Sequence, residues 1–321
     1  MRESLGLDGE TGMSAKPALI CGNWGGTALR VYCLDKGGRL CRDLRFGRGI
    51  NQLTKAEQKA HWFDLVSDLP KVPHLICGSA GSNLGWLETG YVGLPISLNA
   101  IASNVTWFDF DEGRVGIVPG VKGKNPLGEP DTMRSEETEI LGFLEGGEAT
   151  RQRVLCLPGT HNKWVTVIEN EARQFFTSLT GETFHALNKS TVITRGSGAP
   201  SLGAAFDQGV KLGLNPKGAL LQKLYAVRSR QIDSSLAVGD SASFLSGLLI
   251  GADILVAKEI IGDLMHLGVT IIGGDSLGES FERALKLAEI PCDQTSGDDA
   301  SIAGSAAIGR KLGLLSDNPR I

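Results

Sequence analysis

One pattern of strands and turns occurs twice in the sequence, and this internal repeat restricts the fold more than any other feature. The first copy predicts strands at Ala18–Cys21, at Leu29–Asp35 and from Arg39, with turns at 22–27 and 36–38. The second copy predicts strands at Arg153–Leu157, Lys163–Ile168 and Gln174–Leu179, with turns at 158–160 and 169–171. Each copy is an antiparallel meander whose first turn contains Gly and Thr. Because Thr27 and Thr160 are 133 residues apart, the repeat predicts two similar lobes and excludes a solenoid.

The segments between and after the meanders predict further α/β structure. Apolar periodicity favours helices at Glu57–Leu69, Glu136–Leu144, Glu182–Leu187, Ser241–Leu264, Leu277–Leu287 and Asp299–Leu314. Short apolar runs predict strands at His74–Cys77, Val115–Val118 and Val269–Ile272. Small residues in the last helix would let it cross back closely over another helix. We expect a flexible leader at 1–16, an N-terminal lobe at 17–150 and a C-terminal lobe at 151–321 with a helical insertion at 195–235.

Composition limits the compartment and the partners. The net charge of -4 is spread along the chain without a basic stripe, so we expect no nucleic-acid partner. No segment has the roughly 18 apolar residues that a membrane span requires. The six cysteines form no CxxC pair, which predicts reduced thiols and a cytoplasmic location. The five histidines show no ligand spacing, so we assign no transition metal. A homodimer is left open.

Glycine-rich turns are the first candidates for chemistry. Glycine makes up 43 of 321 residues, against a usual share of about 7%, and this excess suits close backbone approach to a ligand. The two Gly-Thr turns present backbone N–H groups that can bind phosphate oxygens. A third glycine site, Gly273-Gly274, lies between a strand and a helix, where a ribose or an α-phosphate could approach the backbone. An ordinary hairpin, or a plain strand-to-helix turn, is the alternative at each site.

These elements, in this order, resemble the actin, sugar-kinase and Hsp70-like ATPase superfamily. The resemblance implies an α/β fold of two actin-like (ribonuclease H-like) lobes with a cleft between them. It also implies that ATP is bound by residues of the three glycine sites, namely Trp24, Gly25, Gly26, Thr27, Gly159, Thr160, His161, Lys163, Gly273 and Gly274. For His161 we favour a structural or phosphate-proximal role over general base catalysis.

Longer segments resemble the 2-dehydro-3-deoxygalactonokinase family in particular. Residues 23–30 are similar to its Asp-Trp-Gly-Thr-Thr/Ser-Asn-Leu-Arg segment, and 81–86 to Gly-Ser-Arg-Gln-Gly-Trp. Residues 131–138 resemble Asp-x-Met-Arg-Gly-Glu-Glu-Thr, and 157–165 resemble Leu-Pro-Gly-Thr-His-Ser-Lys-Trp-Val almost throughout. Matches at 180–182 and 246–251 extend a resemblance that covers roughly residues 17–315. The blocks at 131–138 and 157–165 are specific, whereas glycine turns alone are not.

The family resemblance implies phosphorylation of 2-dehydro-3-deoxy-D-galactonate, or a related keto-deoxy sugar acid, on its 6-hydroxyl by ATP with Mg²⁺. Such a kinase needs a phosphate cradle, a carboxylate near the attacking hydroxyl and a clamp for the sugar acid. We expect Glu136 or Glu137 to act as the base or to position a water molecule, and Asp131 to contact metal or substrate. We expect Arg134 to clamp the substrate carboxylate, with Asn83 and Trp86 also at the sugar acid.

Three positions depart from the family pattern. Asn23 replaces an aspartate, Asn83 replaces an arginine and Gly26 replaces a threonine. A neutral amide at position 23 should weaken the metal site that we expect Asn23 to form with Asp131. Two other functions therefore stay open, a catalytically weak sensor of nucleotide or sugar acid and a phosphatase of the same superfamily.

Overall fold

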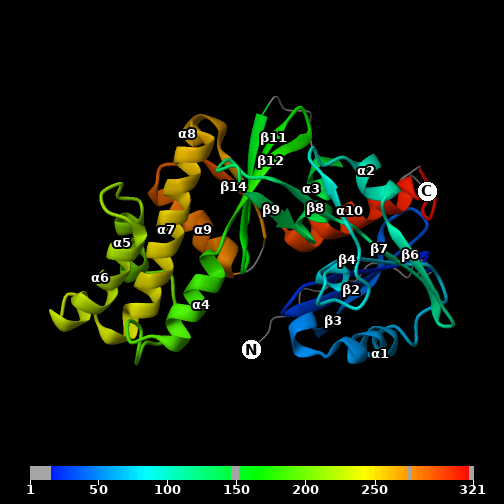
Figure 1. Ribbon diagram of the computed structural model, residues 1–321, viewed down its shortest axis with the longest axis horizontal. Helices are drawn as coiled ribbons and strands as arrows, with labels where there is room; N and C mark the ends of the chain where they lie inside the picture. The colour runs from blue at the N-terminus through cyan, green and yellow to red at the C-terminus, as the bar shows by residue number, and fades with distance from the viewer. Residues whose placement is uncertain (1–15, 146–151, 274–275, 318–321) are drawn as a thin grey trace, which may run out of the picture.

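The computed structural model describes residues 16–145, 152–273 and 276–317. Two large sheets lie in separate parts of the molecule, and helices fill the space between and beside them (Figure 1). The predicted leader, apart from Lys16, lies outside the described residues, as do the predicted lobe boundary at 150–151 and Gly274.

The first sheet has six strands in the order β3-β2-β1-β4-β7-β6. Their bounds are Leu19–Trp24 (β1), Ala28–Leu34 (β2), Leu40–Arg48 (β3), His74–Gly78 (β4), Thr106–Phe110 (β6) and Gly113–Ile117 (β7). β1 pairs antiparallel with β2 and parallel with β4. α1 (Lys55–Leu65) packs on this sheet through Trp62 and Phe63. The first predicted meander is therefore present, and it is joined to parallel strands.

The second sheet repeats this arrangement. Its order is β12-β11-β10-β13-β14, with bounds Gln152–Leu157 (β10), Asn162–Ile168 (β11), Glu171–Ser178 (β12), Val269–Ile272 (β13) and Cys292–Thr295 (β14). β10 pairs antiparallel with β11 and parallel with β13, as β1 does with β2 and β4. The two meanders therefore occupy equivalent places in two similar sheets, which confirms the predicted α/β fold of two actin-like lobes.

A third, small sheet was not predicted. It has the order β5-β8-β9, with bounds Tyr91–Gly93 (β5), Gly120–Lys124 (β8) and Pro130–Met133 (β9), and α2 (Leu98–Ser103) lies between its strands in sequence. The carboxylate of Asp131 on β9 accepts hydrogen bonds from Thr177 on β12. Ile96 forms an isolated bridge with Ala172, also on β12. The small sheet thereby ties the first half of the chain to the second large sheet.

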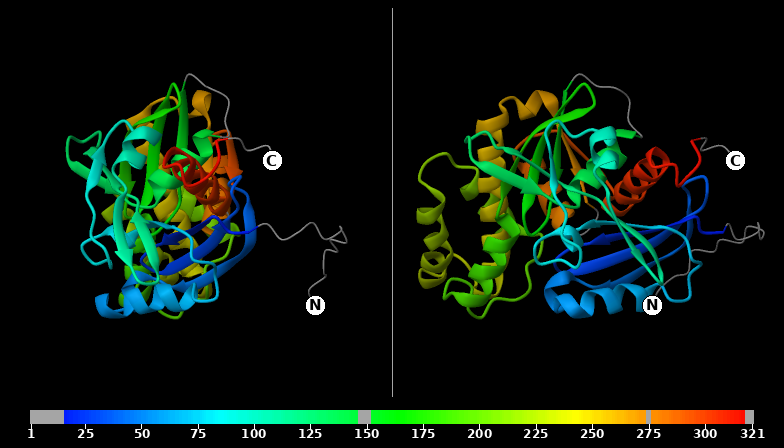
Figure 2. Two further views of the ribbon diagram at one scale, coloured as in Figure 1. Left: turned by 90° about the vertical axis from the view of Figure 1, so that its right-hand side faces the viewer. Right: turned by 45° about the vertical axis from the view of Figure 1, so that its right-hand side comes forward.

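The predicted crossing of two small-residue helices is present. α3 (Glu136–Glu145) packs against α10 (Gly297–Lys311), and a methyl group on Gly142 or Gly304 would lie 1.9 Å from a backbone oxygen of the other helix. The hydroxyl of Tyr32 on β2 lies 2.7 Å from that of Ser305 on α10. Figure 2 shows this last helix beside the N-terminal strands, although it follows the second sheet in sequence.

Helices form the outer part of the second half of the chain. They are α4 (Thr180–Ser190), α5 (Ala204–Gly213), α6 (Leu220–Ile232), α7 (Ser241–Ile261), α8 (Leu264–Leu267) and α9 (Ser276–Leu287). The predicted helix at 241–264 ends earlier, because Gly262 adopts a φ of +93°. α5 and α6, within the predicted insertion, pack beside α7 (Figure 1). Among the described helices, none combines the length and apolar character needed to cross a membrane.

Candidate active site

A cavity of about 680 Å³ lies where the two Gly-Thr turns face each other. Thr27 lines it from the first turn, and Gly159 and Thr160 line it from the second. The other lining residues belong to β2, α4, α5, α7 and α9 and to the segment 200–202. Two turns that are distant in sequence therefore share one cavity, which is the arrangement that a shared phosphate chain would require.

The first turn is held from behind by the segment that follows β3. The amide of Asn51 donates to the carbonyl of Gly26 at 3.0 Å, and a methyl group on Gly49 would lie 2.4 Å from that same oxygen.

Trp24 departs from the expectation that it contacts ATP. Its indole is fully buried, stacks on Trp62 at 6.0 Å and donates to the carbonyl of Arg48, so its side chain belongs to the core.

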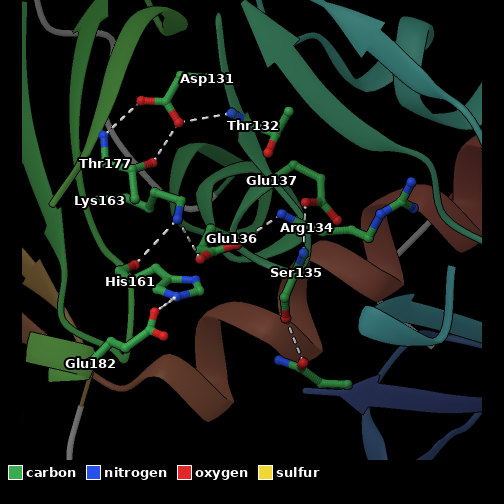
Figure 3. A network of polar contacts seen from close by, with 11 residues as sticks. Asp131, Thr132, Arg134, Ser135, Glu136, Glu137, His161, Lys163, Thr177 and Glu182 are labelled. Carbon is green, nitrogen blue, oxygen red and sulfur yellow. Dashed lines mark hydrogen bonds and ion pairs between the residues drawn. The ribbon is translucent and has the colours of Figure 1, made fainter. Parts of the chain in front are cut away.

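The second turn is held by the first turn of α4. The amide of Glu182 donates to the carbonyl of Thr160 at 2.9 Å, and Nε2 of His161 lies 2.6 Å from Oε2 of Glu182. The side chain of Lys163 is buried rather than solvated. Its Nζ donates to the carbonyl of His161 at 3.2 Å and lies 3.6 Å from Oε1 of Glu136 (Figure 3). Lys163 therefore connects this turn to the start of α3.

The third glycine site lies beside the same cavity. Gly273 follows β13, adopts a φ of +159° and donates to the carbonyl of Thr295. Ser276, Leu277 and Ser280 at the start of α9 line the cavity, whereas Gly273 itself does not. The start of α9 is thus available to a nucleotide.

The three predicted carboxylates have different surroundings. Oδ1 of Asp131 accepts from the amide of Thr132 and the hydroxyl of Thr177, and Oδ2 accepts from the amide of Thr177 (Figure 3). The carboxylate of Glu137 is fully buried and accepts from the amide of Ser135 at 2.8 Å. Glu136 keeps 22% of its side chain exposed beside Lys163. Glu137 is therefore enclosed by protein, whereas Asp131 and Glu136 are both half-buried, Asp131 with both oxygens hydrogen-bonded and Glu136 beside Lys163.

Asn23 contacts a fourth carboxylate that the sequence analysis missed. Its Nδ2 donates to Oε1 of Glu139 at 3.1 Å and to the hydroxyl of Ser301 at 3.2 Å, and its Oδ1 accepts from Ser135 at 2.5 Å. Burial, followed by the charge of Glu136, raises the pKa of Glu139 to about 8. Glu139 follows Glu136 by three residues, the interval that places both on one face of a helix. The three-residue interval between Glu136 and Glu139 is visible in the sequence and could have identified Glu139 as a candidate carboxylate.

Both residues of the expected metal pair, Asn23 and Asp131, have protein partners. The amide of Asn23 bonds to Glu139, Ser301 and Ser135, and both oxygens of Asp131 accept hydrogen bonds from Thr132 or Thr177. Across the part of the chain that the structure describes, no group of three His, Cys, Asp or Glu residues could hold a metal. The metal role of Asn23 and Asp131 stays a prediction.

The expected substrate residues also have structural partners. The guanidinium of Arg134 donates to the carbonyls of Thr89 and Gly90 and lies 4.3 Å from the ring centroid of Tyr91. It therefore holds the 89–91 segment instead of forming a free clamp. Trp86 is half-buried and packs against Phe63 and Phe110 at ring distances of 5.6 and 5.2 Å, and its contact with the sugar acid stays a prediction. Asn83 is exposed, and its substrate contact stays a prediction.

The buried Glu137 makes stability depend on pH. Burial, followed by the charge of Glu136, raises its pKa from 4.5 to about 8. Its folded form keeps a proton that the unfolded form has lost, so the contribution is complete below pH 4.5 and disappears as the pH passes 8. We expect the free energy of unfolding to fall by about 1 kcal/mol per pH unit from this group in that window. Urea titrations across the window should show that Glu137→Gln flattens this slope.

The matched control is Glu88→Gln, because Glu88 is exposed and should leave the slope unchanged. Equal slopes for wild type and Glu137→Gln would contradict the prediction.

Comparison with known proteins agrees with this geometry. Residues 23–308 match the family described as 2-keto-3-deoxy-galactonokinase. A probable 2-dehydro-3-deoxygalactonokinase of Rhizobium meliloti is 29% identical over 302 residues, which cover 90% of this chain and 96% of that protein. The 2-dehydro-3-deoxygalactonokinase of Escherichia coli is 29% identical over 293 residues, or 89% of this chain and 95% of that protein.

A solved structure gives the same result for the fold. The crystal structure of a candidate 2-dehydro-3-deoxygalactonokinase from Sinorhizobium meliloti superposes with a TM-score of 0.82 at 28% identity. The match covers 94% of this chain and 99% of that one. Because the family match spans most of the sequence and the fold agrees over nearly all of it, the chain belongs to the 2-keto-3-deoxy-galactonokinase family.

Proposed function

We propose that the protein transfers the γ-phosphoryl group of ATP to the 6-hydroxyl of 2-dehydro-3-deoxy-D-galactonate or a close keto-deoxy sugar acid. The observation that carries the proposal is the single cavity shared by the two Gly-Thr turns. Family membership supplies the substrate class, since two relatives covering most of the chain bear the name of this kinase.

The cavity has suitable walls for a nucleotide. The turns at Thr27 and at Gly159-Thr160 would hold the phosphates through backbone N–H groups. Apolar side chains from three helices, Phe184, Phe206 and Leu249, line the same cavity and offer a surface for the base. The proposal thus places phosphates between the two sheets and the base toward the outer helices.

Glu136 is the carboxylate that we assign to the reacting hydroxyl. Unlike Glu137 it is partly exposed, and it lies at the start of α3, connected through Lys163 to the second turn. In the reaction, the sugar 6-oxygen bonds to the γ-phosphorus while the bond from that phosphorus to the ADP oxygen breaks. The hydroxyl proton passes to Glu136.

Mg²⁺ is proposed to enter with ATP. Magnesium in kinases binds phosphate oxygens and waters with few protein ligands, so one or two contacts from the predicted pair of Asn23 and Asp131 would suffice. The cytoplasmic location also stays part of the proposal, supported by six cysteines that are free thiols in the structure.

A homodimer stays a prediction that sedimentation of the full chain would test.

A coupled assay of ADP release tests the proposed function. With MgATP and 2-dehydro-3-deoxygalactonate, we expect ADP to form only when the sugar acid is present. Phosphate release without an acceptor would favour the phosphatase, and tight binding of nucleotide or sugar acid without turnover would favour the sensor. D-Galactonate, which lacks the keto-deoxy centre, is the matched control substrate and should react poorly.

A further inference from the structure

An enclosed carboxylate lies behind the second Gly-Thr turn. Asp253 is on α7, and only 6% of its surface is exposed. It follows Ser246, Leu249 and Ile250 by seven, four and three residues, and those three residues line the cavity. Since such intervals share one face of a helix, Asp253 lies on the cavity side of α7 without lining the cavity itself.

Asp253 accepts hydrogen bonds from side chains of β11, β12 and α4, the one from β12 being Ser178. Its Oδ2 accepts from Nδ2 of Asn162 at 2.8 Å and from the hydroxyl of Thr180 at 2.7 Å. Its Oδ1 accepts from Nε1 of Trp164 at 2.9 Å. Asn162 and Trp164 belong to the start of β11, and Thr180 is the first residue of α4. One carboxylate therefore joins α7, β11 and α4.

The second Gly-Thr turn lies between these anchored points. Asn162 lies two residues after Thr160, and the amide of Glu182, two residues after Thr180, donates to the carbonyl of Thr160. A methyl group on Gly181 would lie 2.5 Å from the carbonyl oxygen of Gly159. The position of the turn is therefore set by the two segments that bond to Asp253.

Burying the carboxylate of Asp253 costs desolvation free energy. Burial raises the pKa of Asp253, and hydrogen bonds from its neighbours only partly oppose that effect. An apolar side chain of similar volume would avoid the desolvation cost. A carboxylate can, however, accept several directed hydrogen bonds at once, so its chemistry is suited to fixing geometry.

We propose that Asp253 is a positioning residue that holds the second Gly-Thr turn and the start of α4 in the geometry that binds nucleotide phosphates. It acts through Asn162 and Thr180. The inference rests on the proposed ATP-dependent reaction, because it assumes that this turn receives phosphate.

Calorimetric titration of the full chain with ADP tests the inference, because it measures nucleotide binding and does not require phosphoryl transfer. In Asp253→Asn, an amide N–H₂ must face either the indole N–H of Trp164, which can only donate, or Asn162 and Thr180, which both donate to Asp253 in the wild type. We expect the ADP dissociation constant to rise at least about tenfold. Adding Asn162→Asp returns a carboxylate to the contact, so the double variant should recover to within about threefold of wild type.

The control is Asp207→Asn, which breaks the ion pair of Asp207 with Arg283 at 2.6 Å on the same half of the molecule. It should lower thermal stability without weakening ADP. If Asp253→Asn loses stability but binds ADP as wild type does, Asp253 is only structural and the inference is overturned. Absence of ADP binding in wild type would instead overturn the proposed function.

Should Asp253→Asn fail to fold, Trp164→Phe replaces it. This change removes one donor to Asp253 from a residue outside the cavity lining, and we expect ADP to bind about threefold more weakly. Unchanged affinity would count against the inference.

Discussion

Glu136→Gln should lower kcat by about 10²- to 10⁴-fold, the range for loss of a general base. The amide keeps the shape of the side chain and an acceptor for the amide of Arg134, which bonds to Glu136 at 3.0 Å. It cannot accept the proton of the sugar hydroxyl. Because Glu136 is not among the residues lining the nucleotide cavity, ADP affinity should change by less than about threefold. Steady-state kinetics and calorimetry measure the two quantities separately.

The matched control is Glu145→Gln at the other end of α3. Glu145 is exposed, so the same chemical change on the same helix should leave kcat near wild type. Retention of wild-type kcat in Glu136→Gln would remove Glu136 as the base. Glu139 would then be the next carboxylate to test, since its contact with Asn23 places it at the end of β1.

Gly304→Ala should destabilise the protein by at least about 3 kcal/mol. The added methyl group would lie 1.9 Å from the carbonyl oxygen of Thr138, and a backbone oxygen within a helix cannot turn aside. At a solvent-exposed position inside a helix, the same substitution would stabilise the protein by up to about 1 kcal/mol. The contact between α3 and α10 therefore reverses the sign of the effect, and urea or thermal unfolding would show it.

Gly297→Ala on the same helix is the control, because its nearest contact outside the chain neighbours is an ordinary 3.5 Å from Gly273. It should unfold close to wild type. A Gly304→Ala variant as stable as wild type would mean that α3 and α10 do not approach as closely as the structure shows.

Local patterns were sufficient to predict most of the framework. Both meanders, the strands near 74, 115 and 269, and the crossing helices occur where apolar periodicity and glycine turns predicted them. The small sheet of β5, β8 and β9 was missed because its strands are only three to five residues long and contain Gly and Pro. Such strands depend on pairing partners from elsewhere in the chain rather than on their own sequence.

The candidate site was predicted in its parts but not in its contacts. Two Gly-Thr turns and an acidic helix start could be predicted from the sequence alone, because turns and helix starts follow from local backbone preference. The tertiary structure was needed to show that Trp24 is a core residue, that Trp86 packs against Phe63 and that Asp131 bonds to Thr177. It also decided that Lys163 meets Glu136 across the molecule. Burial and pairing join residues that are far apart in sequence, and local pattern does not encode which of them meet.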